Sequence, residues 1–524
     1  MPRATLFSAT LGEDGKVEPP LGPLYIAAAL QKVGWDVDFR DYQLVPEANP
    51  YDPHLICRFL QNHESTLLIS CFVDMLPVVI AACELVKASR PDTTIILGGP
   101  GPTANAGKFL TTYPWLDGIV MGEGEETVQE WAGAAAARTV PRTPIAGMAL
   151  RCDGIAVEGP ARPRIRNGFL RPAYHLLDWT RYSSARVVTT RGCPYRCSFC
   201  DVAPLWGRRA VYRDLNDTID EMLTLRDRYG QASIAIVDDT FVLNRDRVRE
   251  FCRLLIARDC NLKWGCFGRI NLMSEELIAA MARAGCVGVF YGIDSGSPGI
   301  LRRTLKELDS ETIYPTLETS AQYFERIEAS FIWGYPFETY DDFELTLEMA
   351  GEASRLAPKV NVQMHMLSPL PSSPLYKEFP RALLPPDRAD RDWLLLPALL
   401  LDERAQEVRR IIDYDPSLFP GFFTFPTPDK EKKREALTRA MKALDHTIGL
   451  TLFDADVHGL ISHDDCAAER RLIESAGNTE ERIGIGLALG FFSRTRAHPK
   501  TSAPGASQRG PAIVRERNDQ MALR

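Results

Sequence analysis

The sequence predicts an α/β protein in which a doubly wound parallel sheet is followed by a partial, six-fold βα barrel and then by a mainly helical C-terminal region. Two observations predict this order. Short apolar stretches alternate with helical ones in two separate series, and beyond residue 380 only helical periodicity continues. The 524 residues also agree with about three domains, at roughly 100 to 200 residues each.

The first series, residues 1–135, contains five strand-like stretches: 5–10, 36–44, 66–72, 93–99 and 118–122. Short apolar strands that alternate with helices predict a parallel sheet covered on both faces, which is a Rossmann-like arrangement. Such sheets bind ligands at the carboxyl ends of their strands.

Small or glycine-rich turns occupy those strand ends. They include Gly22, Ser70 with Phe72, Gly98 with Gly99, and Glu123 between two glycines. We expect these residues to bind a large cofactor, while the alternative is that the glycines only permit tight turns. The first turn lacks a G-x-G-x-x-G motif, which disfavours a nicotinamide cofactor.

Residues 136–184 are rich in Pro, Gly and Arg and are predicted to form a connector. The second series, residues 185–380, has strand-like stretches at 185–190, 232–237, 262–267, 287–293, 329–334 and 360–366, separated by helical ones. Six βα units in sequence predict a TIM-like parallel barrel that is open on one side.

Residues 381–493 form the predicted helical region, which we expect to cap the barrel, and its aromatic stretch 419–425 is either a pocket wall or simple core. Residues 494–524 are polar, rich in Pro, Gly and Ser, and net positive, which predicts a disordered tail.

The composition excludes several classes of function. The net charge of -8 is spread without a basic block, so we expect no nucleic acid partner. No apolar run approaches the roughly 20 residues of a membrane span, and Glu13 and Asp14 lie where a signal peptide would be apolar. We therefore expect a cytoplasmic protein with no membrane association.

Three of the twelve cysteines lie within eight residues, in RGCPYRCSFCD: Cys193, Cys197 and Cys200. Structural zinc sites commonly use two separated Cys pairs, whereas no second pair follows this C-x3-C-x2-C spacing. Three thiolates on one loop can hold three irons of a cubane cluster and leave the fourth iron open for chemistry. The spacing therefore favours an iron-sulfur cluster over zinc, with Arg191 and Arg196 bringing positive charge near it.

The other cysteines are predicted to be small buried side chains. Cys252, Cys260, Cys266 and Cys286 could be considered for an auxiliary cluster, but they fall on different predicted elements, which favours core thiols.

The motif CPYRCSFC, placed after the first strand of a βα barrel, resembles that of the radical S-adenosylmethionine enzymes. Further similar stretches follow each barrel strand, at 236–244, 267–271, 291–302, 333–343 and 367–376. Upstream, residues 19–30, 96–105 and 119–131 resemble a cobalamin-binding domain. The resemblance to the cobalamin-dependent subgroup covers roughly residues 1–380 and implies a 4Fe-4S cluster, S-adenosylmethionine and cobalamin as cofactors.

The resemblance also implies roles for individual residues. Cys193, Cys197 and Cys200 would ligate the cluster, and Phe199 would contact adenine through its backbone. Asp238 and Asp239 occupy the place of a Gly-Gly-Glu motif that holds the methionine amino group. Arg269 would neutralise the methionine carboxylate, and Asp294 with Ser295 would contact the ribose. Tyr291, Tyr335 and Glu338 are weaker candidates for substrate contact or proton transfer. For each polar residue, the alternative is a surface salt bridge or a helix cap.

The first domain departs from one cobalamin pattern. Where many such domains have Asp-x-His, with the His as lower axial ligand, this chain has Asp41 and Gln43. The departure implies either cobalamin bound without a histidine ligand or a domain that no longer binds the cofactor.

The function that the resemblance implies is a C-methyltransferase acting on an unactivated carbon of a biosynthetic small molecule or a peptide. A 5′-deoxyadenosyl radical would abstract hydrogen, and methylcobalamin would supply methyl. An electron donor such as flavodoxin or ferredoxin would be a partner. The alternative is radical rearrangement, cyclisation or dehydrogenation without methyl transfer. Methylthio transfer is disfavoured because no second Cys triad exists, and a cofactor sensor would leave the barrel motifs unexplained.

Overall fold

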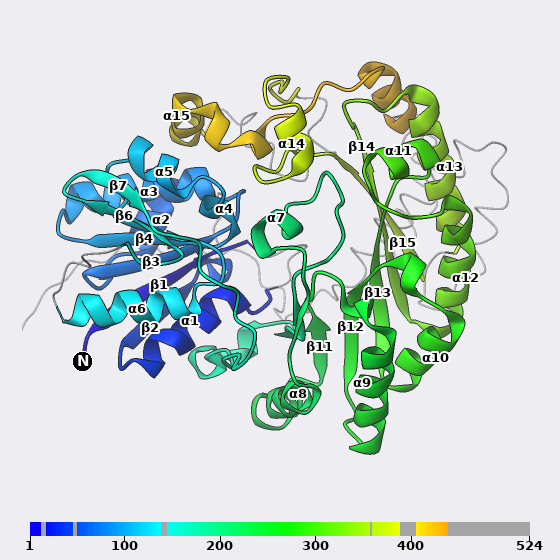
Figure 1. Cartoon of the computed structure of the whole chain (residues 1–524), viewed down its shortest axis with the longest axis horizontal. Coiled ribbons are helices and arrows are strands. Elements are labelled where there is room, and N and C mark those ends of the chain that lie inside the picture. The colour runs from blue at the N-terminus through cyan, green and yellow to red at the C-terminus, as the bar shows by residue number, and fades with distance from the viewer. Residues whose placement is uncertain (12–16, 46–49, 138–143, 357–358, 388–404, 439–524) are drawn as a thin grey trace, which may run out of the picture.

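The computed structural model describes residues 1–11, 17–45, 50–137, 144–356, 359–387 and 405–438. Two sheets dominate it, a mostly parallel one built from the first 160 residues and a parallel one from residues 185–366 (Figure 1). Within these ranges, no helix is both long enough and apolar enough to cross a membrane. The predicted α/β class and the order of its parts are confirmed.

The first sheet has the strand order β2-β1-β3-β4-β5-β6-β7. Its parallel strands are β1 (Arg3–Ala9), β2 (Asp36–Asp41), β3 (Thr66–Cys71), β4 (Thr94–Gly98) and β5 (Gly118–Val120). Two antiparallel strands, β6 (Met148–Cys152) and β7 (Ile155–Glu158), extend this sheet from within the predicted connector.

Helices cover both faces of the first sheet. On one face, α1 (Leu21–Lys32) and α6 (Glu125–Ala136) pack in one apolar cluster with strand residues. On the other face, α2 (Pro53–Phe59), α3 (Leu76–Ser89) and α5 (Ala106–Thr112) do the same, with the short α4 (Pro100–Thr103) before α5. The sheet is therefore doubly wound, as its alternating sequence predicts.

The second sheet has six parallel strands in the order β15-β14-β13-β12-β11-β8. They are β8 (Ala185–Val187), β11 (Ser233–Ile236), β12 (Lys263–Gly268), β13 (Cys286–Asp294), β14 (Arg326–Trp333) and β15 (Val360–Met366). The sheet ends at β8 and β15 without closing, so the barrel is partial. A separate two-stranded ladder joins β9 (Thr190–Arg191) and β10 (Val211–Tyr212).

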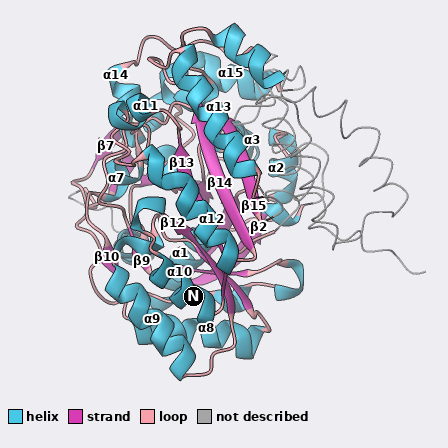
Figure 2. Cartoon of the chain, turned by 90° about the vertical axis from the view of Figure 1, so that its right-hand side faces the viewer, coloured by secondary structure: helices cyan, strands magenta, loops and turns pink. Residues whose placement is uncertain are grey.

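The barrel helices lie outside this curved sheet (Figure 2). They are α8 (Leu215–Tyr229), α9 (Arg245–Ala257), α10 (Glu275–Arg283), α12 (Ile313–Tyr323) and α13 (Tyr340–Ser354). Two shorter helices, α7 (Val202–Trp206) and α11 (Pro298–Arg303), follow strand ends. A capping box between Thr339 and Asp342 fixes the start of α13. Trp264 and Cys266 of β12 point outward into this helix layer, whereas Phe267 points inward and is 40% exposed.

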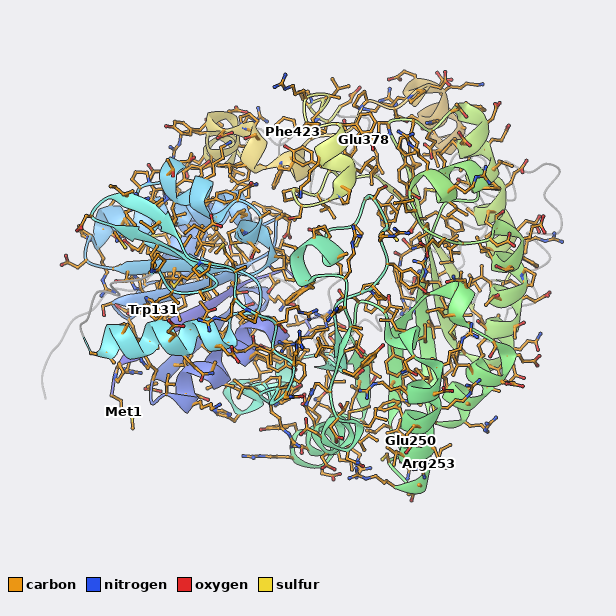
Figure 3. The ribbon with its side chains drawn as sticks, viewed as in Figure 1. Met1, Trp131, Glu250, Arg253, Glu378 and Phe423 are labelled. Atoms are coloured by element: carbon orange, nitrogen blue, oxygen red, sulfur yellow. The ribbon has the colours of Figure 1, made fainter. Side chains whose placement is uncertain are left out.

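The C-terminal segment contacts both the first domain and the barrel. Within it, α14 (Pro374–Glu378) follows the barrel, while α15 (Gln406–Tyr414) packs in one cluster with α3. Glu378 and Phe423 lie at the opposite end of the molecule from Glu250 and Arg253 of α9 (Figure 3). Phe419 and Phe425 are buried in apolar clusters, which agrees with the core interpretation of this aromatic stretch. Most of the predicted helical region, and all of the predicted tail, lie outside the described residues.

Candidate functional site

A cavity of about 760 Å³ lies between the two sheets. The carboxyl ends of β1, β3, β4 and β5 border it from the first domain, and residues from β8, the end of β11 and the loop after β15 border it from the barrel. The helix α7, directly after the cysteines, lies between the two sheets and contributes Leu205 and Trp206 (Figure 1). The ligand-binding edges of both sheets therefore face one space.

The structure brings together the residues predicted to bind the cofactor in the first domain. Gly22, Ser70, Phe72, Gly98, Gly99 and Glu123 all line the cavity. An added Cβ at Gly22 or Gly122 would meet no atom within 4 Å, so the backbone there is open to a ligand. Phe72 is 50% exposed, which offers an apolar face to a large planar ligand. These features fit a corrinoid.

Asp41 and Gln43, at the position of the Asp-x-His pattern, are engaged within the protein. Asp41 accepts hydrogen bonds from the Tyr182 hydroxyl at 2.9 Å and from the Gln43 backbone N–H at 3.2 Å. The Gln43 amide exchanges hydrogen bonds with the backbone of Glu18. Gln43 lines the cavity, but no histidine is among the described residues that do so.

The three clustered cysteines lie on the loop that follows β9, as predicted. The Ser198 N–H donates to the Thr304 carbonyl at 2.8 Å, and the Leu375 N–H donates to the Ser198 carbonyl at 2.7 Å, so backbone bonds hold this loop. Burial raises the pKa of Cys200 to about 12. Among the described residues, no three His, Cys, Asp or Glu side chains converge on a single ion site. A cluster with one thiolate per iron does not require such convergence, and a donor set of three soft thiolates fits it.

Arg269, at the end of β12, lies against the cysteine loop. Its guanidinium stacks 3.7 Å above the ring centroid of Tyr195, and Nη1 lies 3.7 Å from the Sγ of Cys197. The side chain is buried, yet its Nε and Nη2 have no hydrogen-bond partner in the structure. A buried guanidinium with unused donors fits a carboxylate ligand.

Asp294 and Phe199 both lie beside Lys306, which no local motif in the sequence marks. Asp294, at the end of β13, has a left-handed backbone with φ of 69° and forms a buried ion pair with Lys306. The Lys306 ammonium also lies 5.9 Å from the centroid of the Phe199 ring. Ser295 is directed elsewhere, since its hydroxyl bonds to that of Thr346 on α13 at 2.9 Å.

The two acidic residues at the end of β11 lie in different surroundings. Asp239 lines the cavity, whereas Asp238 is almost fully buried and accepts three hydrogen bonds from Thr189 and Thr190. Burial raises the pKa of Asp238 to about 6. Asp238 is thus saturated by protein groups, while Asp239 faces the ligand space.

The two tyrosines proposed as catalytic residues also differ. Tyr291 points out of the barrel, and its hydroxyl lies 3.1 Å from that of Ser320 on α12, so the structure does not bring it to the cavity. Tyr335 is buried beside Phe199, with ring centroids 6.0 Å apart, and its hydroxyl has no hydrogen-bond partner in the structure. Glu338 forms a fully buried ion pair with Lys433 of the C-terminal segment at 2.9 Å.

The two arginines predicted to bring positive charge near the cluster have protein partners in the structure. Arg191 is paired with Glu123 and Glu125 across the domain boundary, and Arg196 is exposed and lies 3.6 Å from Glu307. That both charges serve the cluster stays a prediction. Arg269 is the arginine in contact with a clustered cysteine.

Of the remaining cysteines that the structure describes, six are buried, as the core interpretation predicts, whereas Cys57 and Cys152 are only half-buried. Cys252, Cys260, Cys266 and Cys286 are buried, and all eleven described cysteines are free thiols. Cys466 lies outside the described residues.

Comparisons with known proteins agree with this geometry. The family model "B12 binding domain" matches residues 8–132, and the model "Radical SAM superfamily" matches residues 187–350. An uncharacterized methyltransferase of Pyrococcus horikoshii is 27% identical over 352 residues, which is 64% of this chain and 74% of that protein. An anaerobic magnesium-protoporphyrin IX monomethyl ester cyclase of Rubrivivax gelatinosus is 27% identical over 387 residues, 69% of this chain and 67% of that protein.

The fold has a solved counterpart. The radical S-adenosylmethionine methyltransferase TsrM from Kitasatospora setae, solved with cobalamin and a 4Fe-4S cluster bound, has a TM-score of 0.63 and 18% sequence identity. The match covers 95% of this chain and 100% of the other, so the arrangement of sheet, partial barrel and C-terminal segment is shared.

Proposed function

Because the chain belongs to the cobalamin-dependent radical S-adenosylmethionine enzymes, we propose that it is a C-methyltransferase that adds a methyl group to an unactivated carbon of a biosynthetic small molecule or a peptide. One observation carries this proposal. The turns that fit a corrinoid and the strand ends next to the cysteine loop border the same cavity. A substrate held there can meet both cofactors without leaving the site.

The residues that would hold each cofactor follow from the contacts described above. Cys193, Cys197 and Cys200 would ligate the 4Fe-4S cluster, and the unused donors of Arg269 would bind the carboxylate of S-adenosylmethionine. The Lys306–Asp294 pair would lie beside the nucleoside. When bound, the cluster and S-adenosylmethionine supply a 5′-deoxyadenosyl radical, and cobalamin carries the methyl group.

The chain's own side chains position these groups. Gly22, in the first turn of α1, and Gly122, in the turn after β5, leave the backbone open to the corrinoid. Asp239 faces the cavity, and burial raises its pKa, so it is suited to hold or release a proton near the substrate. Tyr335, with an unpaired buried hydroxyl, would donate a hydrogen bond near Phe199.

The supporting partners are also part of the proposal. An electron donor such as flavodoxin or ferredoxin would reduce the cluster. Twelve cysteines are too few for a disulfide scaffold in a chain of 524 residues, which favours a reducing compartment, and we propose the cytoplasm.

A second function is favoured by one comparison. The similarity to the magnesium-protoporphyrin IX monomethyl ester cyclase supports a radical cyclisation or oxidation without methyl transfer. The cofactor sites would look alike in both cases, so products must separate the two.

The test uses the full chain, reconstituted anaerobically with iron, sulfide and hydroxocobalamin, and then given a chemical reductant and S-adenosylmethionine with a deuterated methyl group. A methyltransferase should form S-adenosylhomocysteine and 5′-deoxyadenosine and place the label on the bound corrinoid. 5′-Deoxyadenosine alone, with an unlabelled corrinoid, would favour the second function. The variant Cys197→Ala is the control and should form no 5′-deoxyadenosine.

A further inference from the structure

Arg191 joins the cysteine loop to the first domain. It lies two residues before Cys193, and its side chain crosses to the turn that follows β5. Nη1 pairs with Oε1 of Glu123 at 3.0 Å, and Nη2 pairs with Oε1 of Glu125 at 2.7 Å. All three side chains are at most 10% exposed. A planar guanidinium that reaches two carboxylates at once fixes both distance and direction.

Aromatic rings hold the same guanidinium. The Arg191 guanidinium carbon lies 4.7 Å from the ring centroid of Tyr25 and 5.0 Å from that of Phe169. Tyr25 belongs to α1 of the first domain, so a second element of that domain contacts the arginine. Cation–π contacts of this kind strengthen when they are buried.

The positive and negative charges of this ion-pair network are equal in number. Glu123 also pairs with Nε of Arg164 at 3.3 Å and accepts the N–H of Ile165 at 2.9 Å, so two arginines face two glutamates. Arg164 further donates to the backbone carbonyl of Arg191 at 3.2 Å. A buried ion pair with its polar atoms satisfied is costly to break from one side. Both the side chain and the backbone of residue 191 are thus held.

The two ends of this connection belong to the two halves of the site. Glu123 and Glu125 line the cavity on the side that fits the corrinoid, and Arg191 lines it on the barrel side. Beyond Arg191 the chain passes through Gly192, with φ of 88°, where an added Cβ would lie 2.8 Å from the Arg209 carbonyl oxygen. The cysteine loop therefore leaves from one fixed point.

We propose that Arg191 is a positioning residue. It sets the place of the cysteine loop relative to the turn after β5, on the corrinoid side of the cavity, so that both cofactors act on one substrate position. This inference rests on the proposed function, because only a two-cofactor reaction needs the two sites in register. Small displacements of reacting groups cost rate steeply.

The matched pair of variants is Arg191→Met and Arg162→Met. Arg162 pairs with Glu126 and Glu130 of α6, the helix that also contains Glu125, but Arg162 does not belong to the cysteine loop. In protein without cofactors, we expect Arg191→Met to speed amide hydrogen exchange in residues 118–126 and 188–200, and Arg162→Met to leave 188–200 unchanged. Glu125→Gln, which removes one of the two ion pairs, covers the case in which Arg191→Met does not fold.

In reconstituted protein, the readout is the ratio of methyl label on the corrinoid to 5′-deoxyadenosine. We expect this ratio to fall about tenfold in Arg191→Met, with 5′-deoxyadenosine still formed, and to fall less in Arg191→Lys. Unchanged exchange and an unchanged ratio in Arg191→Met, or an equal effect of Arg162→Met, would overturn the inference. If the wild-type protein itself never labels the corrinoid, the proposed function fails. The hydrogen-exchange measurement alone then tests whether Arg191 positions the cysteine loop.

Discussion

The carboxylate of Asp239 accepts a hydrogen bond of 2.8 Å from the backbone N–H of Gly192, the residue directly before the first clustered cysteine. Its neighbour Asp238 turns inward and accepts the N–H groups of Thr189 at 2.6 Å and Thr190 at 3.0 Å. Two adjacent acids at the end of β11 thus hold the backbone that enters the cysteine loop. Asp239 alone of the pair also faces the cavity.

The first prediction concerns the pH dependence of stability. Burial raises the pKa of Asp238 to about 6, above its unfolded value of about 3.9. The folded state therefore binds this proton more tightly, and its contribution to stability should fall as pH rises from about 4 to about 6 and be level above. Relative to Asp238→Asn, the unfolding free energy of wild type should decrease over that window. Urea unfolding of cofactor-free protein at a series of pH values measures it, and parallel pH profiles would refute the assignment.

The second prediction concerns S-adenosylmethionine binding. Arg269→Met removes the unused buried donors, and a hydrogen bond to a charged group contributes about 1.5 to 3 kcal/mol, so affinity should fall about 10- to 150-fold. Equilibrium binding to reconstituted protein measures the change, after iron content is shown to match wild type. Arg196→Met, an exposed arginine of the same loop, should bind normally. Equal losses in both variants would mean that the effect is only electrostatic.

The third prediction concerns Gly99, in the glycine turn that follows β4. Gly99 has φ of 93°, and an added Cβ would lie 2.6 Å from the Cys71 carbonyl oxygen. Gly99→Ala should therefore cost about 1 to 3 kcal/mol of stability and weaken hydroxocobalamin binding. Gly133→Ala, in α6 with no atom within 4 Å of the added Cβ, should instead stabilise by about 0.5 to 1 kcal/mol. Thermal unfolding and corrinoid retention test both variants, and normal binding by Gly99→Ala would contradict the placement.

The fourth prediction concerns the C-terminal segment. The Lys433 ammonium donates to the Glu338 carboxylate at 2.9 Å, to the Glu338 carbonyl at 2.6 Å and to the Thr427 hydroxyl at 2.8 Å, with both charged side chains fully buried. Lys433→Met should cost about 3 to 5 kcal/mol because it leaves a buried carboxylate unpaired. Lys433→Met combined with Glu338→Leu should cost less. Arg410→Met, which breaks an exposed pair with Glu84, should cost under about 1 kcal/mol in the same urea titrations.

Much of the fold follows from local patterns in the sequence. The βα alternation gives all eleven parallel strands of the two main sheets, because each buried strand is a short apolar run. The hairpin of β6 and β7 lies within the Pro- and Gly-rich stretch predicted to be a connector, and it differs from that prediction. Its signal was present, since Asp153 and Gly154, with φ of 48° and 81°, join two short strands as an Asp-Gly turn.

The parts of the candidate site that depend on spacing along the chain can be predicted from the sequence. The parts that depend on which face of a strand a side chain occupies, or on contacts between distant residues, are harder to predict. The cysteine motif and the glycine turns are local signals. Tyr291 alternates with Phe290 and Gly292, which point inward, so its own side chain faces the helix layer, and only the strand's register in the sheet reveals this. Lys433 meets Glu338 across 95 residues of sequence, and no local pattern marks that contact.

The most direct test of a shared two-cofactor cavity is electron paramagnetic resonance of the full chain loaded with iron, sulfide and cob(II)alamin, recorded before and after reduction of the cluster. Because the strand ends next to the cysteine loop border the same cavity as the turns that fit a corrinoid, we predict that the cobalt signal broadens or relaxes faster once the cluster becomes paramagnetic. A cobalt signal that is identical in both states, with both cofactors bound, would contradict the shared cavity.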